Sequence, residues 1–146
     1  MINNTEFNHI KNTVFSLVNF KFEGEISICD YDGIKVEFDG KNAKIGCKDK
    51  SSLGRALFIL AKDSPKGAFS VEEKIRFKYL GVMLDMARNR AMRVKSVKKY
   101  LDNLAALGFN SLMLYLEDMI ELQSYPRFGY MRGRYTVEEL KEIDDY

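Results

Sequence analysis

The stretch from Tyr79 to Arg88, Tyr-Leu-Gly-Val-Met-Leu-Asp-Met-Ala-Arg, constrains the fold more than any other part of the chain. Five of its first six residues are apolar and none of the six is charged, which is typical of a strand buried on both faces of a parallel sheet. The run ends with a carboxylate, Asp85, and a guanidinium, Arg88. We therefore expect a buried strand whose carboxyl end carries charged side chains.

A second strand of the same kind follows at 111–116, where almost every residue is apolar. Between the two strands, apolar residues at helical spacing predict a helix that Gly108 terminates; they are Val94, Val97, Leu101, Leu104 and Ala105. A strand, a helix and a second strand form a βαβ unit, whose strands are parallel. After a polar and aromatic loop, residues 136–139 predict a capping box that begins a last helix.

The first half of the chain predicts a smaller unit of helices and strands. Helical periodicity over 5–18 predicts an amphipathic helix, and alternation predicts strands at 25–31, 34–38 and 43–47. Asp32-Gly33 and Asp39-Gly40 lie at the junctions between these strands. Because glycine favours tight hairpin turns, we expect a three-stranded antiparallel meander.

A second helix is expected to begin after a cap at Ser51 or Ser52 and to end at Pro65-Lys66-Gly67. Two helices can cover the apolar face of the sheet, which predicts an α+β two-layer unit over residues 1 to about 68. Residues 69–77 add a strand or lead to the following unit. The predicted domains are therefore 1–77 and 78–146, and the first one carries no pattern typical of catalysis.

The composition is that of a folded protein, with 46% apolar and 30% charged residues. The 23 Lys and Arg residues nearly balance the 21 Asp and Glu residues, so the charge does not indicate a nucleic acid or a membrane partner. The N-terminal residues lack the features of a signal peptide, and no apolar stretch reaches about 18 residues. We therefore expect a cytoplasmic protein.

The sequence does not predict a metal site or a cofactor. Cys29 and Cys47 are expected to remain thiols, because a pair of cysteines in a chain of this kind is more often reduced. His9 is the single histidine, and its predicted helix supplies no further metal ligands.

Charged residues are expected to meet at one edge of the parallel sheet. Asp85 and Arg88 follow the first strand, Glu117 and Asp118 follow the second, and parallel strands end at the same edge. An arginine that donates and carboxylates that accept suit a polyhydroxyl ligand. A structural salt bridge between the strand ends is equally compatible with these residue types.

Several motifs follow one another in the second half of the chain: Leu80-Gly-Val-Met-Leu-Asp-Met-Ala-Arg88, Leu-Gly-Phe-Asn110, Leu114-Tyr-Leu-Glu-Asp118, the stretch 125–136, and Glu138-Glu-Leu-Lys-Glu-Ile143. Together they resemble the start of the catalytic barrel of family 20 glycoside hydrolases, the exo-acting β-N-acetylhexosaminidases. The resemblance covers 75–146, and the upstream unit is similar to the small non-catalytic domain that precedes the barrel in that family.

The resemblance implies that the βαβ unit begins a (β/α)8 TIM barrel and that the substrate is a glycan ending in N-acetylhexosamine. It implies that Arg88 binds hydroxyls of the terminal sugar, and that Asp118, with Glu117 near it, lies beside the catalytic pair. In that family the 2-acetamido carbonyl attacks the anomeric carbon, an Asp orients the amide, and an adjoining Glu protonates the leaving oxygen.

Three further charged residues are expected to be structural or solvated. Asp85 matches the family's motif, but we expect it to pair with loop donors or with Arg88. Arg132 and Arg134 could reach the sugar from their loop, although exposed arginines are usually solvated.

The chain contains no Asp-Glu dipeptide, so it has no predicted catalytic residue. A complete barrel takes roughly 250 residues, and we therefore interpret the chain as the N-terminal fragment of such an enzyme, inactive alone. We expect the fragment to self-associate through the open edge of its barrel. The alternative, from another functional class, is a non-catalytic binding or assembly module.

Overall fold

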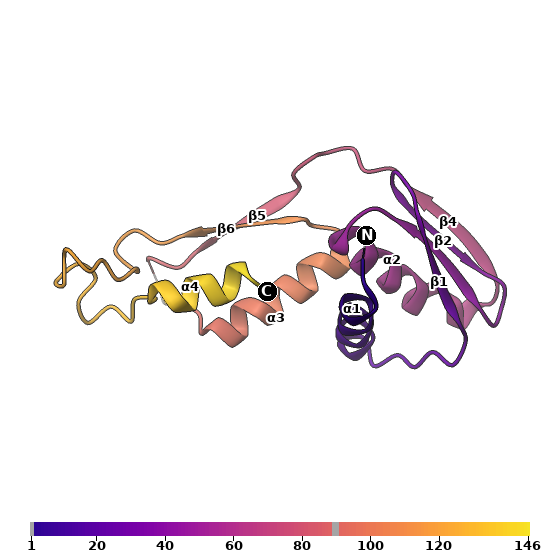
Figure 1. Cartoon of the computed structure of the whole chain (residues 1–146), viewed down its shortest axis with the longest axis horizontal. Helices are drawn as coiled ribbons and strands as arrows, with labels where there is room; N and C mark the ends of the chain where they lie inside the picture. Colours follow the sequence, from indigo (N-terminus) through magenta and orange to yellow (C-terminus); the bar gives the residue numbers. More distant parts are fainter. Residues whose placement is uncertain (1, 89–90) are drawn as a thin grey trace. The chain divides into compact units, whose positions relative to one another are not determined.

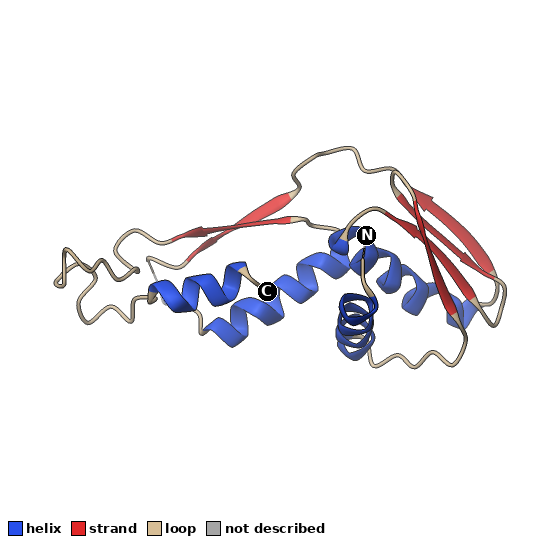
Figure 2. Cartoon of the chain, in the orientation of Figure 1, coloured by secondary structure: helices blue, strands red, loops and turns tan. Residues whose placement is uncertain are grey.

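The computed structural model describes residues 2–88 and 91–146. The chain forms two compact units, one made of Met1–Leu80 and Asp102–Asn110, the other of Gly81–Leu101 and Ser111–Tyr146. Both units combine helices with strands, as Figure 1 and Figure 2 show. The predicted domain division after residue 77 stays a prediction.

The elements of the first unit follow the predicted order along the chain. They are α1 (Asn4–Leu17), β1 (Ile26–Asp30), β2 (Ile34–Phe38), β3 (Ala43–Cys47), α2 (Lys50–Asp63), the short 3-10 helix η1 (Ser64–Lys66) and β4 (Phe69–Glu73). One predicted cap is wrong, because Asp49 and not a serine is the N-cap of α2. The Asp49 side chain accepts from the N–H of Ser52, whose hydroxyl accepts from the N–H of Asp49, so Ser52 is the third helical residue of a capping box.

In the described part of the chain, these strands form a four-stranded sheet in the order β1-β3-β2-β4. β2 pairs antiparallel with β3 and with β4, but β1 pairs with β3 in parallel. The predicted antiparallel meander is therefore wrong at its first step, and the sheet is mixed. The turn after β1 reverses the chain, as its sequence predicts, but it also carries the chain past the end of β3.

Tyr31 gives a physical reason for this course of the chain. A Cβ added at Gly46 of β3 would lie 2.8 Å from the Cβ of Tyr31, so the glycine leaves room for the tyrosine beside β3. The Tyr31 hydroxyl donates to Glu72 on β4. One side chain therefore connects the end of β1 to the opposite edge strand, a non-local contact that a turn motif cannot predict.

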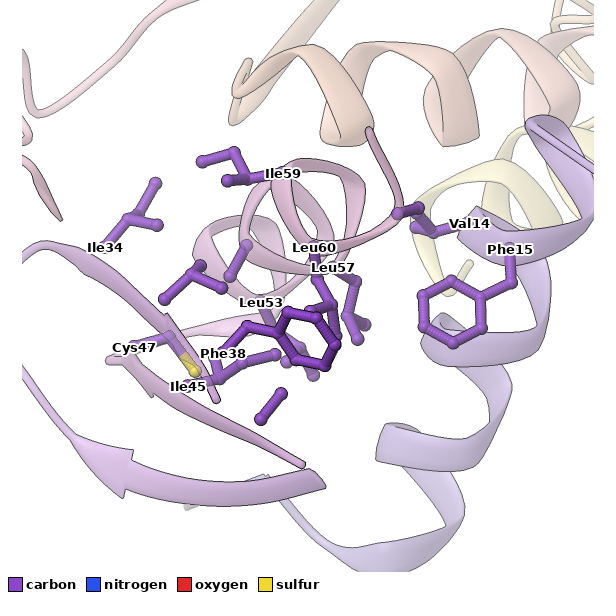
Figure 3. Close-up of a cluster of buried hydrophobic side chains, with 14 residues drawn as sticks. Val14, Phe15, Ile34, Phe38, Ile45, Cys47, Leu53, Leu57, Ile59 and Leu60 are labelled. Atoms are coloured by element: carbon purple, nitrogen blue, oxygen red, sulfur yellow. The ribbon is translucent and has the colours of Figure 1, made fainter. Parts of the chain in front are cut away.

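The core of the first unit lies between α2 and one face of the sheet (Figure 3). Leu53, Leu57 and Leu60 of α2 are fully buried there, and each buried leucine stabilises the fold by about 1.5–3 kcal/mol. α1 packs beside α2 and adds Val14 and Phe15 to the core. The two predicted helices thus contribute to one core, with α2 as the one that lies on the sheet.

Residues 102–110 complete the first unit, and they include the end of α3 (Val94–Leu107). Ala105 lies so close to Gly54 of α2 that a Cβ added at this glycine would be 3.3 Å from the alanine Cβ. The Asn110 side chain accepts from the N–H of Leu80 at 2.7 Å and donates to the carbonyl of Lys78 at 3.0 Å. The two hydrogen bonds of Asn110 fix the segment that directly precedes β5 (Gly81–Asp85).

The second unit confirms the predicted βαβ arrangement. β5 (Gly81–Asp85) and β6 (Ser111–Tyr115) pair in parallel, with Gly81 opposite Ser111 and Asp85 opposite Tyr115. Leucines of both strands pack against α3 and α4 (Val137–Asp144), which lie on the same side of the strands in Figure 2. The predicted capping box of α4 is also present, since Thr136 accepts from the N–H of Glu139.

The expectation that both β5 and β6 are buried on two faces is wrong for this structure. Met83 and Met113, which are paired across the two strands, are 60% and 62% exposed. The physical reason is that the described residues provide helices for one face of these strands only.

Also within the described residues, no helix is long and apolar enough to cross a membrane.

We expect the two cysteines to differ strongly in reactivity. Cys29 is an exposed thiol on β1, whereas Cys47 is buried and its burial raises the pKa of the thiol to about 11. The thiolate is the reactive form, and at pH 8 roughly one thousandth of Cys47 would be ionised. An aromatic disulfide reagent should therefore label Cys29 rapidly and Cys47 only when the protein unfolds.

The matched variants assign the signal to one residue. Cys29→Ser should remove the rapid reaction and Cys47→Ser should leave it unchanged. Rapid labelling of both thiols in the folded wild-type protein would contradict the buried position of Cys47.

Candidate functional site

The carboxyl ends of β5 and β6 form an edge that we call the rim, made of Asp85, Arg88, Tyr115, Glu117 and Asp118. The rim exists because the parallel register sets Asp85 opposite Tyr115, so the residues that follow each strand leave the sheet at the same end. All three predicted binding residues belong to the rim.

Asp85 shapes the turn that follows β5. One of its carboxylate oxygens accepts from the backbone N–H groups of Ala87 and Arg88 at 3.0 and 3.1 Å, and the other lies 3.5 Å from Nε of Arg88. These bonds confirm the expectation that Asp85 pairs with loop donors and with Arg88. An aspartate commonly stabilises a turn in this way by bonding backbone groups two residues further on.

Arg88 and Glu117 meet through Tyr115. The guanidinium carbon of Arg88 lies 5.7 Å from the centre of the Tyr115 ring, although the Arg88 side chain is 70% exposed. The Tyr115 hydroxyl donates to Glu117 at 2.6 Å. Tyr115 was missed by the sequence analysis. An aromatic residue at the end of a strand, next to an expected arginine, is the signal that could have indicated it.

The charges of the rim act on the Tyr115 hydroxyl. The hydrogen bond to Glu117 and its negative charge raise the pKa of Tyr115 above the usual value, while Arg88 lowers it. Glu117 itself has a φ of 45°, a left-handed conformation that is uncommon for a residue other than glycine. Backbone strain of this kind is frequent at functional sites.

Asp118 is connected to the rim through Arg132. One guanidinium nitrogen of Arg132 lies 3.6 Å from a carboxylate oxygen of Asp118 and also donates to the carbonyl of Ala87. Arg132 therefore joins the chain after β6 to the chain after β5. The expectation that this arginine is merely solvated is wrong.

Several hydrogen bonds hold the loop between β6 and α4 in its conformation. Arg134 binds Glu121 at 3.3 Å and the carbonyls of Pro126 and Phe128, and its side chain is only 20% exposed, so it too is not merely solvated. The N–H of Tyr135 donates to Met119 at 2.8 Å. The buried hydroxyl of Tyr135 donates to the carbonyl of Met92, and burial raises the pKa of this tyrosine.

The rim therefore offers an exposed guanidinium and carboxylates at one end of a parallel pair of strands. Such a set can bind a ligand with several hydroxyl groups, since arginine donates hydrogen bonds and carboxylates accept them. Arg88 and Asp118 have different partners within this set. Arg88 lies over the ring of Tyr115, and Asp118 pairs with Arg132. Among the residues described, no group of three or more His, Cys, Asp and Glu side chains could hold a metal ion.

The second half of the chain matches a known family. Residues 77–146 match the model of glycosyl hydrolase family 20, catalytic domain. No curated protein matches the chain.

The fold is similar to several solved structures. An N-acetyl-β-hexosaminidase of Streptomyces plicatus, in complex with Thio-NAglucal, is 20% identical, with a TM-score of 0.76 and coverage of 99% of this chain and 38% of that chain. A family 20 exo β-N-acetylglucosaminidase of Vibrio harveyi, in complex with N-acetylglucosamine, is 18% identical, with a TM-score of 0.75 and coverage of 99% and 29%. Another family 20 β-N-acetylglucosaminidase is 23% identical, with a TM-score of 0.73 and coverage of 99% and 34%.

At these identities the likeness to solved structures establishes the fold alone. The chain spans about a third of the length of these three structures.

Gly129 is expected to be required for the packing of the loop against Asp118. It has a φ of 64°, and a Cβ added there would lie 1.8 Å from the carbonyl oxygen of Asp118. Gly133 has a similar φ of 70° but nothing within 4 Å of an added Cβ, so it is a matched control. A left-handed conformation costs a non-glycine residue about 1–2 kcal/mol.

Gly133→Ala should therefore lower the free energy of unfolding by about that conformational cost, and Gly129→Ala should lower it clearly further. Urea unfolding gives both values, and amide exchange over 119–135 shows where the loop opens. Equal effects of the two substitutions would contradict the contact between Gly129 and Asp118.

Proposed function

Since residues 77–146 belong to glycosyl hydrolase family 20, we propose that this chain is the N-terminal part of a β-N-acetylhexosaminidase. Its βαβ unit is then the beginning of a (β/α)8 barrel, and the unit around α2 is the accessory domain that precedes the barrel. The parallel β5 and β6 with a connecting helix are the repeating element of such barrels. Coverage of about a third of the similar structures agrees with a partial chain.

The proposed reaction of the whole enzyme is removal of a terminal N-acetylhexosamine by substrate-assisted hydrolysis with retention. Arg88 would bind hydroxyl groups of that sugar, while Glu117 and Asp118 would lie near it or support the rim. The single observation that carries this proposal is the position of Arg88, which exposes a charged donor at the carboxyl end of the first parallel strand. In TIM-barrel enzymes, substrates bind at this end of the strands.

We further propose that the 146 residues alone do not catalyse the reaction. The mechanism needs an aspartate that orients the acetamido group and an adjoining glutamate that protonates the leaving oxygen. The chain contains Glu117-Asp118 but no Asp-Glu dipeptide. As for the compartment, we propose the cytoplasm.

The 146-residue chain should bind N-acetylglucosamine weakly through Arg88 and should not hydrolyse an aryl N-acetylglucosaminide. A chemical-shift titration with N-acetylglucosamine should perturb residues of the rim, and Arg88→Ala should remove the perturbation. Arg76→Ala, a change of another exposed arginine outside the rim, is the control and should leave binding intact.

Two results would contradict these proposals. Turnover that persists through purification and disappears in Arg88→Ala would show that the chain is catalytic alone. Sugar binding that is insensitive to Arg88→Ala would contradict the role of Arg88 and would favour a non-catalytic binding module.

We also propose that the chain self-associates through β5 and β6. Among the described residues neither strand has a partner on its outer edge, and the exposed face carries Met83 and Met113. Unpaired strand edges readily pair with another chain. Pairing of the edges of two copies would satisfy these backbone groups, and contact between the exposed faces would cover the methionines.

Light scattering should therefore give a mass above 16.9 kDa for the wild-type chain. Met113→Lys should shift the mass toward that of the monomer, because it places a charge on the exposed face. Met131→Lys is the control, since Met131 is 89% exposed but lies in the loop. A monomeric wild-type chain with protected amides on both strands would exclude this association.

A further inference from the structure

Tyr115 lies at the centre of the rim and contacts residues from both strand exits. It is the last residue of β6 and is partly buried, whereas Arg88 beside it is exposed. A free arginine side chain has many rotamers, and fixing it for binding costs rotamer entropy. The Tyr115 ring on one side and the Asp85 carboxylate on the other limit this freedom before any ligand arrives.

The hydroxyl of Tyr115 makes a second contact, a hydrogen bond to Glu117. A tyrosine hydroxyl has one proton to donate, and Tyr115 donates it to Glu117 at 2.6 Å. Tyr115 is therefore poorly suited to donate to a ligand itself. Its effect on a ligand would pass through the two charged residues that it holds.

We propose that Tyr115 is the positioning residue of the rim, whose ring orients Arg88 and whose hydroxyl orients Glu117 toward the terminal sugar. This inference rests on the proposed function, because it takes Arg88 to be the sugar-binding residue. It adds a residue that contacts no sugar but decides how two charged side chains are presented to one.

The two contacts can be measured without any ligand. Glu117 raises the pKa of Tyr115 and Arg88 lowers it, so the ionisation of this hydroxyl reports on both neighbours. Tyrosinate absorbance is recorded against pH, and the difference between each protein and its Tyr115→Phe counterpart isolates Tyr115. Glu117→Gln should shift this titration to lower pH, and Arg88→Ala should shift it to higher pH.

The second measurement is binding of N-acetylglucosamine to the 146-residue chain. Tyr115→Phe keeps the ring and loses the bond to Glu117, whereas Tyr115→Leu loses both contacts. An exposed cation–π contact of about 0.5–1 kcal/mol corresponds to a roughly two- to fivefold change in affinity. Tyr115→Leu should weaken binding by at least that factor, and Tyr115→Phe should weaken it less. Tyr130→Leu, which changes an exposed loop tyrosine, is the control.

The outcomes distinguish this inference from the proposed function. If Arg88→Ala abolishes binding but Tyr115→Leu binds as the wild-type chain does, the positioning role is wrong and the proposed function stands. If Arg88→Ala leaves binding unchanged, the proposed function fails and the positioning role fails with it. If neither Glu117→Gln nor Arg88→Ala shifts the Tyr115 titration, the contacts themselves are refuted.

Discussion

The parallel pairing of β5 with β6 is the interaction on which the candidate site depends. Its register sets Asp85 opposite Tyr115, and this places Arg88 beside the tyrosine ring and Glu117 within reach of the hydroxyl. Successive side chains of a strand point to opposite faces, so a slip of one residue would turn Tyr115 to the other face. Close approach of the strands also requires Gly81, since a Cβ added there would lie 2.8 Å from the Ser111 carbonyl oxygen.

The individual charge contacts of the rim are weak, because exposed ion pairs contribute about 0–1 kcal/mol each. The order of the rim comes instead from backbone groups. Asp85 binds two N–H groups of the turn, Arg132 binds the carbonyl of Ala87, and Arg134 binds loop carbonyls. A site of this kind keeps its shape while its charged side chains stay accessible to a ligand.

Local patterns predicted the elements well, and non-local contacts explain what they missed. Apolar periodicity and capping signals located the helices, the strands and the box at Thr136, because these features depend on neighbours in sequence. The rule that parallel strands end at the same edge of a sheet also predicted that Arg88, Glu117 and Asp118 lie together. The partner of β1 was missed because it depends on Tyr31 reaching past Gly46. The contact of Tyr115 with Arg88 was missed because it depends on the pairing of β5 with β6, and the contacts of Arg132 were missed because a folded loop creates them.

The first unit is not continuous in sequence, because residues 102–110 belong to it although the whole of β5 intervenes. Ala105 of this distant segment packs close to Gly54 of α2, and the Asn110 side chain accepts from the N–H of Leu80. During synthesis the first unit therefore cannot complete its packing until β5 and the whole of α3 have also been made. For the same reason, a recombination point placed between the two halves of the gene would separate Gly54 from Ala105 and Leu80 from Asn110, which contact each other within one unit.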